Sequence, residues 1–168
     1  MKIPIVNEQD EVLTYKEREE TTGQDIRRIV ILNVFNEKGE VLVAKRQSTK
    51  TIDPNKWGPA VEGTVDEGYD YDATVVKEAD EEVGLKNIKP VFYKKIFYET
   101  EHTRRFAAVY HVYIDSSEPL VLQEEEVAET KWITIHNLEK WLKESPADFL
   151  PSFSIKFENI KEIYETQS

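Results

Sequence analysis

Short apolar runs separated by polar turns dominate the chain, and this pattern predicts a protein built mainly of β-strands. The clearest run is RIVILNVF at residues 28–35. A turn at residues 36–39 and a second run, VLVAKR at residues 41–46, follow it, so a β-hairpin is expected here. Further strands are expected at residues 3–6, 12–15, 91–98, 105–114 and 131–135.

The segment at residues 63–85, GTVDEGYDYDATVVKEADEEVGL, predicts a glycine-rich turn, a helix and a glycine stop. Asp70 or Asp72 can cap the helix, because a short acidic side chain accepts hydrogen bonds from free backbone N–H groups. Gly84 can end it in the left-handed conformation. At about 100° per residue, three apolar side chains share the arc that is expected to pack on a core: Val76, Ala79 and Val83.

Two more helices are expected near the C-terminus. The pattern LEKWLK predicts a helix at residues 138–143, with Asn137 as its cap and Pro146 as its interruption. The amphipathic tail at residues 148–168 predicts a terminal helix. Strands with a central helix and C-terminal helices indicate an α/β or α+β domain.

Three carboxylates, Glu78, Glu81 and Glu82, fall within about 100° on one edge of the central helix. Like charges at this spacing repel one another by a few tenths of a kcal/mol per pair. A hard divalent cation such as Mg²⁺ or Mn²⁺ would offset the repulsion, since these ions favour oxygen ligands. The alternative interpretation is a solvated acidic helix face.

Composition narrows the classes of function. The chain has 168 residues, enough for one ordinary domain, and 22 basic against 33 acidic residues give a net charge of −11. Such a charge disfavours nucleic acid and anionic membranes as partners, and a phosphate site would need local Arg, Lys or metal. The absence of cysteine excludes disulfides, thiolate zinc sites and cysteine nucleophiles. No leader or membrane-spanning pattern is visible, so a cytoplasmic location is expected.

The spacing of the acidic segment resembles the Nudix box of the MutT-like pyrophosphohydrolases, G-x5-E-x7-R-E-U-x-E-E-x-G-U, in which U is a bulky apolar residue. The positions that match the box are Gly63, Glu78, Glu81, Glu82, Gly84 and Leu85. The positions that depart from it are Tyr69 in place of Glu, Lys77 in place of Arg and Ala79 in place of a larger apolar residue.

This resemblance implies a Nudix α/β/α sandwich with a mixed central β-sheet. It implies a single domain over residues 1–168. The expected parts are an N-terminal hairpin extension at 1–27, a core at 28–145 and a C-terminal helical tail at 146–168. A homodimer is also implied, since dimers are common in the family.

The resemblance further implies a Mg²⁺-dependent hydrolase, with Mn²⁺ as a possible substitute, acting on a small-molecule diphosphate. The implied metal ligands are the carbonyl of Gly63 and the carboxylates of Glu78, Glu81 and Glu82. A general base is expected from the box, at Glu81 or Glu82, or from a later loop. For the later loop, the candidates are Glu101 and Glu126. The alternative for Glu126 is that it belongs to an exposed cluster of charges.

Three further residues are candidates for substrate binding. Arg46 ends a strand where relatives often place a phosphate-binding arginine; the alternative is a surface charge. Lys77 takes the place of the box arginine, but an ammonium group cannot reproduce its planar fork. Trp57 can stack on a ligand, or it can fold its loop onto the core.

Tyr69 and Lys77 also open a second hypothesis, a ligand-binding or sensing module with weak catalysis, because family members use this Glu and Arg to orient the catalytic loop and helix. A third hypothesis follows from a wider similarity, over residues 3–135, to the subgroup that includes isopentenyl-diphosphate isomerase and its hydrolase-like bacterial relatives. The isomerase needs a cysteine, metal-binding histidines and a Glu-His-Glu segment. This chain has no cysteine, Asp25–Arg27 near the expected histidines, and Thr103 for the second glutamate, so isomerase activity is disfavoured.

Overall fold

Strand β3 (Ile26–Phe35) is the centre of the sheet in the computed structural model, which describes residues 1–167. Its long apolar run pairs in parallel with β8 (Arg104–Tyr113) along its whole length. Its other edge pairs antiparallel with β6 (Val61–Thr64). Each face of β3 lies in an apolar core, which explains why its sequence is apolar on both faces.

Within the described residues the mixed sheet has nine strands and three α-helices cover it. The other strands are β1 (Lys2–Val6), β2 (Val12–Glu17), β4 (Glu40–Arg46), β5 (Trp57–Pro59), β7 (Val91–Glu99) and β9 (Val127–Thr134). The helices are α1 (Tyr71–Val83), α2 (Ile135–Glu144) and α3 (Phe153–Gln167), with short 3₁₀ turns at Arg18–Glu20 and Pro146–Asp148.

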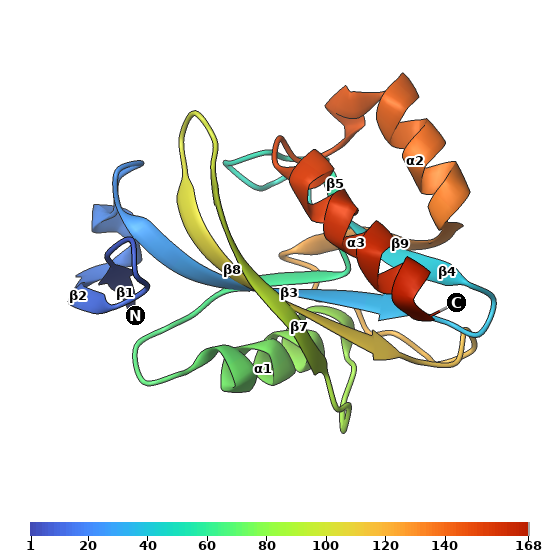
Figure 1. Ribbon diagram of the computed structural model, residues 1–168, viewed down its shortest axis with the longest axis horizontal. Helices are drawn as coiled ribbons and strands as arrows, with labels where there is room; N and C mark the ends of the chain where they lie inside the picture. Colours follow the sequence, from blue (N-terminus) through green and yellow to red (C-terminus); the bar gives the residue numbers. More distant parts are fainter. Residues whose placement is uncertain (168) are drawn as a thin grey trace.

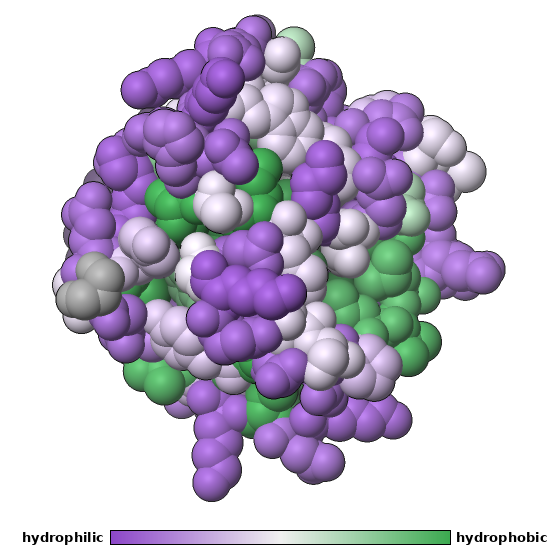
Figure 2. Space-filling model, turned by 90° about the vertical axis from the view of Figure 1, so that its right-hand side faces the viewer, coloured by the Kyte–Doolittle hydropathy of each residue, from purple (hydrophilic) through white to green (hydrophobic). Residues whose placement is uncertain are grey.

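The layers form the predicted α/β/α sandwich, with α1 on one face of the sheet and α2 and α3 on the other (Figure 1). One apolar core, which includes Leu32 and Val61, lies under α1, and the other, which includes Ile31 and Phe157, lies under α2 and α3. The surface seen in Figure 2 is mostly hydrophilic, with apolar side chains in separate groups. None of the helices in the described part of the chain is long and apolar enough to cross a membrane.

The predicted hairpin of β3 and β4 is only partly correct. The turn forms, but the two strands pair at a single position, Phe35 with Val41. Strand β4 then pairs with β5 and β9 instead. The physical reason is that β6 occupies the edge of β3 that β4 would need. This divergence of β3 and β4 opens the sheet beside β6.

Helix α1 begins and ends as predicted. The Asp70 carboxylate accepts a hydrogen bond from the backbone N–H of Ala73 at 2.7 Å, and Gly84 ends the helix with φ +71°. The predicted core face was wrong by one position, because Val76 is 45% exposed. The apolar residues that pack on the sheet are Val75, Ala79 and Val83, which follow one another at intervals of four. Ala79 and Val83 were predicted, and Val75 takes the place of Val76.

The C-terminal helices differ from prediction in their boundaries. Asn137 is not the cap of α2; the side chain of Thr134 accepts a hydrogen bond from the Asn137 N–H at 3.2 Å and caps the helix. The strand expected at residues 131–135 is longer, and it ends at Thr134 because Ile135 starts the helix. Helix α3 forms as expected, although Ser168, included in that expectation, lies outside the described residues.

The N-terminal hairpin is tied to the core by Asp10. Its carboxylate lies 2.7 Å from Arg28 Nε, 2.7 Å from Lys95 Nζ and 2.9 Å from the Tyr71 hydroxyl. Burial alone would raise the pKa of the Asp10 carboxyl, but the hydrogen bonds from Lys95, Arg28 and Tyr71 hold it below its usual value. The network therefore joins the hairpin to β3, β7 and α1.

Replacing Asp10 by Asn is expected to lower the free energy of unfolding by about 2 kcal/mol at pH 7, because two cations lose a carboxylate partner. A lowered folded-state pKa means that this contribution is complete above pH 3.8, the unfolded value, and is lost as the pH falls through the folded pKa. Urea denaturation at several pH values measures it, with the exposed Asp80→Asn as control. A difference that stays constant below pH 3.8 would contradict the ionic origin.

Candidate active site

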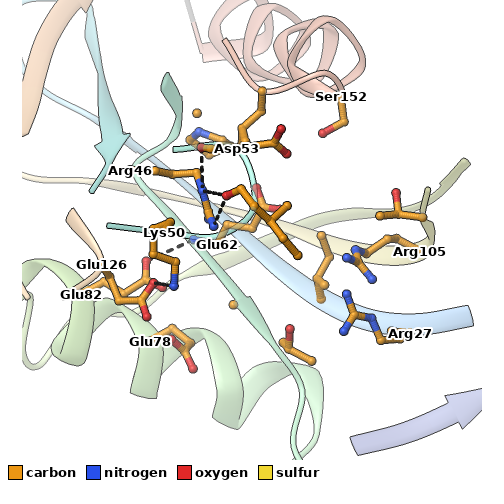
Figure 3. A pocket seen from close by; sticks show the side chains of 18 of the residues that line it. Arg27, Arg46, Lys50, Asp53, Glu62, Glu78, Glu82, Arg105, Glu126 and Ser152 are labelled. Atoms are coloured by element: carbon orange, nitrogen blue, oxygen red, sulfur yellow. Dashed lines mark hydrogen bonds and ion pairs between the residues drawn. The ribbon is translucent and has the colours of Figure 1, made fainter. Parts of the chain in front are cut away.

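A pocket of about 800 Å³ lies beside β6, where the sheet opens. Its walls come from β3, β4, β6, α1 and the start of α3 (Figure 3). Figure 3 shows that the two sides differ in charge: Glu78, Glu82 and Glu126 lie on one side, and Arg27 and Arg105 lie on the other.

The acidic side is built on the contact between Gly63 and Glu78. Gly63 lies in β6, and a Cβ atom at this position would be 2.6 Å from Cδ of Glu78. Since real Cβ atoms do not approach another carbon this closely, only glycine allows the Glu78 carboxylate to reach the strand. The fold therefore places Gly63 directly beside Glu78.

Glu82 lies one turn further along α1, beside the same strand. The backbone N–H of Glu62 points to Glu82 Oε2 at 3.4 Å. Burial and the nearby carboxylate of Glu78 raise the pKa of Glu82 well above its usual value. Burial also raises the pKa of Glu78, and Lys77 only partly opposes it. The two carboxylates thus form a site that favours binding a cation or a proton.

These oxygens fit a divalent cation of the Mg²⁺ type. Within residues 1–167, no three His, Cys, Asp or Glu side chains already converge into a complete metal cage. Mg²⁺ does not need one, because it is usually held by one or two carboxylates, several waters and substrate phosphates. Glu78 and Glu82 supply the two carboxylates, whereas Glu81 is exposed where α1 borders the pocket. The metal role of Glu81 and of the Gly63 carbonyl stays a prediction.

Two of the three departures from the Nudix box, Tyr69 and Lys77, contact each other. The Lys77 ammonium lies 5.0 Å from the centre of the Tyr69 ring, a cation–π arrangement. The same ammonium lies 3.4 Å from Asp66 Oδ2 and 3.6 Å from Glu78 Oε1. Lys77 therefore connects the loop before α1 to a metal-binding candidate, which is the kind of orienting contact that the Glu and Arg of the box would supply.

Lys50 and Arg46 bring positive charge to the acidic side. Lys50 Nζ lies 2.8 Å from Glu126 Oε2, and both residues line the pocket. The Arg46 guanidinium donates to the carbonyls of Ile52 and Asp53 at 2.9 to 3.2 Å, so it fixes the loop that carries Lys50. Arg46 also lines the pocket, as its predicted role in substrate binding requires.

Two predicted site residues lie elsewhere. The Glu101 side chain is 87% exposed, beside His102, and does not line the pocket. Glu126, the other predicted later-loop candidate, does line the pocket and lies near enough to raise the pKa of Glu82. Trp57 is buried against Trp141, with ring centres 5.3 Å apart, and it belongs to the core under α2 and α3. Of the two predicted roles of Trp57, packing its loop onto the core is the one that the structure shows, and ligand stacking is wrong because this indole is used for packing.

Sequence reasoning missed the basic side of the pocket. Lys156 is only 2% exposed and lies 2.7 Å from Glu62 Oε2. Arg27 and Arg105 lie on neighbouring strands. A signal for Lys156 was its place on the apolar stripe of α3, between Phe153 and Phe157. Charged residues at core-facing positions are rare unless they are paired, so each of these was a candidate for a specific role.

Comparison with known proteins agrees with this geometry. The NUDIX domain family model matches residues 25–153. The chain is 31% identical over 132 residues to the Nudix hydrolase PA4841 of Pseudomonas aeruginosa, covering 78% of this chain and 77% of that one. It is 28% identical over 154 residues to the Nudix hydrolase YfcD of Salmonella typhi, covering 91% and 83%.

Among solved structures, DR0079 from Deinococcus radiodurans superposes with a TM-score of 0.72 at 22% identity, covering 86% of this chain and 90% of that one. This likeness agrees with the sandwich fold of Figure 1. The family model covers the strand β6, helix α1 and the loop that carries Glu126, which together form the acidic side of the pocket. The chain therefore belongs to the Nudix family of hydrolases, enzymes that act on pyrophosphate bonds.

Proposed function

We propose that this protein is a Mg²⁺-dependent hydrolase, with Mn²⁺ able to replace Mg²⁺, that cleaves the pyrophosphate linkage of a nucleoside diphosphate derivative or a related organic pyrophosphate. The observation that carries the proposal is the pair of crowded carboxylates, Glu78 against Gly63 and Glu82 beside Glu62, at one side of a substrate-sized pocket. Burial raises the pKa values of both, and neighbouring carboxylates add to the effect, so a bound cation would stabilise their charged forms.

Glu78 and Glu82 would hold the cation, together with the predicted ligands Glu81 and the Gly63 carbonyl. When bound, such an ion acidifies water and neutralises phosphate charge. In the hydrolysis, a water oxygen forms a bond to phosphorus while the bridging P–O bond breaks and its electron pair leaves with the departing phosphate. The proton from the water passes to a carboxylate. We assign this role to Glu126, because this later-loop carboxylate lines the pocket.

Lys50 and Arg46 would bind the phosphates. Lys50 already contacts Glu126, so a substrate phosphate at the acidic side would compete for the same ammonium and release the carboxylate to act as a base. Arg46 would keep the loop in place, since its guanidinium holds two loop carbonyls. Lys77, held by Asp66 and Tyr69, would orient Glu78 rather than contact the substrate.

A ligand-binding module with weak catalysis is the second candidate, favoured by Tyr69 and Lys77 standing where the box has Glu and Arg. Isomerase activity is not proposed, because the chain lacks the cysteine that this reaction needs. A homodimer and a cytoplasmic location stay predictions.

The test is phosphate release from a panel of nucleotide and non-nucleotide diphosphates, with and without Mg²⁺, read through a coupled phosphatase or pyrophosphatase. We expect release from at least one substrate, dependent on Mg²⁺ or Mn²⁺ and abolished by a chelator. The control is the same panel with heat-inactivated protein. If no substrate of the panel releases phosphate although calorimetry shows metal binding, the hydrolase proposal is contradicted and the binding module is favoured.

A further inference from the structure

Arg27 and Arg105 face each other across two neighbouring strands. They form one register pair of the parallel ladder between β3 and β8, and both line the pocket. Paired residues of adjacent strands point to the same face of a sheet, so the two guanidinium groups share one side of the pocket (Figure 3). Like charges directly opposite each other destabilise a sheet, which calls for a compensating partner.

Within residues 1–167, no carboxylate oxygen lies within 4.0 Å of a guanidinium nitrogen of Arg27 or Arg105. The two nearest candidates are already occupied: Asp25 contacts Lys16 at 2.9 Å, and Glu62 contacts Lys156 at 2.7 Å. The Arg27 guanidinium donates to the hydroxyl of Thr21 at 3.5 Å, a long bond to a neutral partner. Arg105 neighbours Tyr98, which is a neutral partner because burial raises the pKa of its phenol.

The arginines next to them in sequence behave differently. Arg28 lies 2.7 Å from Asp10, and Arg104 lies 2.9 Å from Glu99. Both are therefore compensated within the protein. Arg27 and Arg105 differ from them: among residues 1–167, they face each other across the ladder without an ion pair to a carboxylate of their own.

The structure makes this arrangement unfavourable in the free protein. Burial and the charge of Arg105 lower the pKa of Arg27 to about 10. Burial also lowers the pKa of Arg105. Arg18 adds a third positive charge nearby, which opposes the charged form of both. An anion between Arg27 and Arg105 would therefore remove a real electrostatic cost.

This basic pair lies away from the carboxylates that would hold the metal. Gly63 pairs with Val30 of β3, and Arg27 lies three residues before Val30. At about 3.3 Å per residue along a strand, the backbone of Arg27 lies about 10 Å along β3 from that of Val30, beside Gly63. That is longer than the distance between adjacent phosphoryl groups of one pyrophosphate. The arginines are therefore placed to meet a different part of the substrate.

We propose that Arg27 and Arg105 form an anion-binding subsite for a second anionic group, a phosphate monoester or a carboxylate, at the end of the substrate remote from the cleaved pyrophosphate. The planar guanidinium forks match either group by bidentate hydrogen bonds. The assignment of this group to the substrate rests on the hydrolase function proposed above. The preferred substrates would then be organic pyrophosphates with anions at both ends.

The first test uses the chelator-treated protein and needs no substrate. Inorganic phosphate and, separately, acetate are titrated while the thermal unfolding midpoint and the heat of binding are measured. We expect phosphate, acetate or both to bind the wild type, and the anion that binds names the class. Arg27→Gln and Arg105→Gln should weaken this binding about tenfold or more, since each removes charge-assisted hydrogen bonds.

The matched control is Arg104→Gln, which removes an arginine from the same strand that is paired with Glu99 rather than facing the pocket. It should bind the anions like the wild type. Arg27→Lys keeps the charge without the fork and should bind with intermediate affinity, which separates charge from folding defects. Equal affinity in all variants, or no anion binding by the wild type, would overturn the proposal.

The second test separates this subsite from the catalytic function. Glu82→Gln should lose turnover but keep the metal-free anion binding. Compared with the wild type, Arg27→Gln should have a KM about tenfold higher for a diphosphate that carries a second anionic group. Its KM should be unchanged for a diphosphate that lacks such a group. If both KM values rise equally, the arginines do not select a second anion, and the hydrolase function would stand without them.

Discussion

Replacing Glu82 by Gln is expected to lower kcat by at least about a hundredfold on the best substrate of the panel, because it removes one of the two buried carboxylates available to a metal. The fold should survive the change. A glutamine has nearly the same shape, and its carbonyl oxygen can still accept the Glu62 N–H that now points to Glu82.

The stability of this variant gives an independent readout. Burial and Glu78 raise the pKa of Glu82, which means that the charged form is disfavoured in the metal-free fold. Neutral glutamine removes that cost, so the metal-free variant should unfold at or above the wild-type temperature. Mg²⁺ should stabilise the wild type and have little effect on the variant, since stabilisation by a ligand follows its affinity.

Asp80→Asn is the matched control, because Asp80 lies exposed on α1 and does not line the pocket. It should leave kcat and KM unchanged. Glu81→Gln ranks the third carboxylate of the box: an intermediate loss would support its predicted place among the metal ligands. Unchanged turnover of Glu82→Gln with every substrate would refute the metal-dependent mechanism.

The acidic side of this site was predictable from sequence because its parts are close together in the chain. The caps at Asp70 and Gly84 set the limits of α1, and helical geometry then places Glu78 and Glu82 on one edge. The contact with Gly63 comes from the preceding strand and turn. Where tertiary packing decided the outcome, prediction failed: the helix buries Val75 rather than Val76.

The basic side was not predictable because it depends on long-range pairing. The Arg27–Arg105 pair exists only because β8 runs parallel to β3, which no local pattern specifies. The exchange of Glu101 for Glu126 has a similar cause, since β9 pairs with β4 and brings the preceding loop to the pocket. Trp57 was ambiguous for another reason: an indole serves packing or stacking equally well until its neighbours are known.

Tyr69 and Lys77 show how a departure from a motif can keep its purpose. Seen as isolated substitutions, they remove a charged pair that orients the helix. In the structure they form a cation–π contact, and Asp66 supplies the carboxylate that Tyr69 lacks. The orientation of Glu78 is thus maintained by other atoms, which supports catalysis over a purely binding role.

Replacing Lys156 by Met is expected to lower the free energy of unfolding by about 3 kcal/mol, the second large effect that we predict. The Lys156 ammonium lies 2.9 and 2.7 Å from the two Glu62 oxygens and is almost completely buried. Methionine keeps much of the volume, but it leaves the Glu62 carboxylate without its cation. Removing one partner of a buried pair costs more than the pair itself contributes.

Two comparisons identify the cause. Lys161→Met, on the same helix, breaks a half-exposed pair with Glu139 at 2.9 Å and should cost less than about 1 kcal/mol. The double variant Glu62→Gln/Lys156→Met removes both charges and should regain much of the stability lost by Lys156→Met. Urea denaturation of the four proteins, with the wild type as reference, gives these differences directly.

The pH dependence gives a further check on the sign. Burial alone would lower the pKa of Lys156, but Glu62 and Tyr98 raise it above 10.5, its usual value. A raised folded-state pKa means that the pair stabilises the fold fully below pH 10.5 and loses this contribution as the pH rises through the folded value. The wild type should therefore approach the Lys156→Met variant in stability only in strong alkali. Two results would contradict this prediction: equal stabilities of the wild type and Lys156→Met near neutral pH, or an equal loss of unfolding free energy in Lys161→Met. Either would mean that the Lys156–Glu62 pair does not stabilise the packing of α3 beside the pocket.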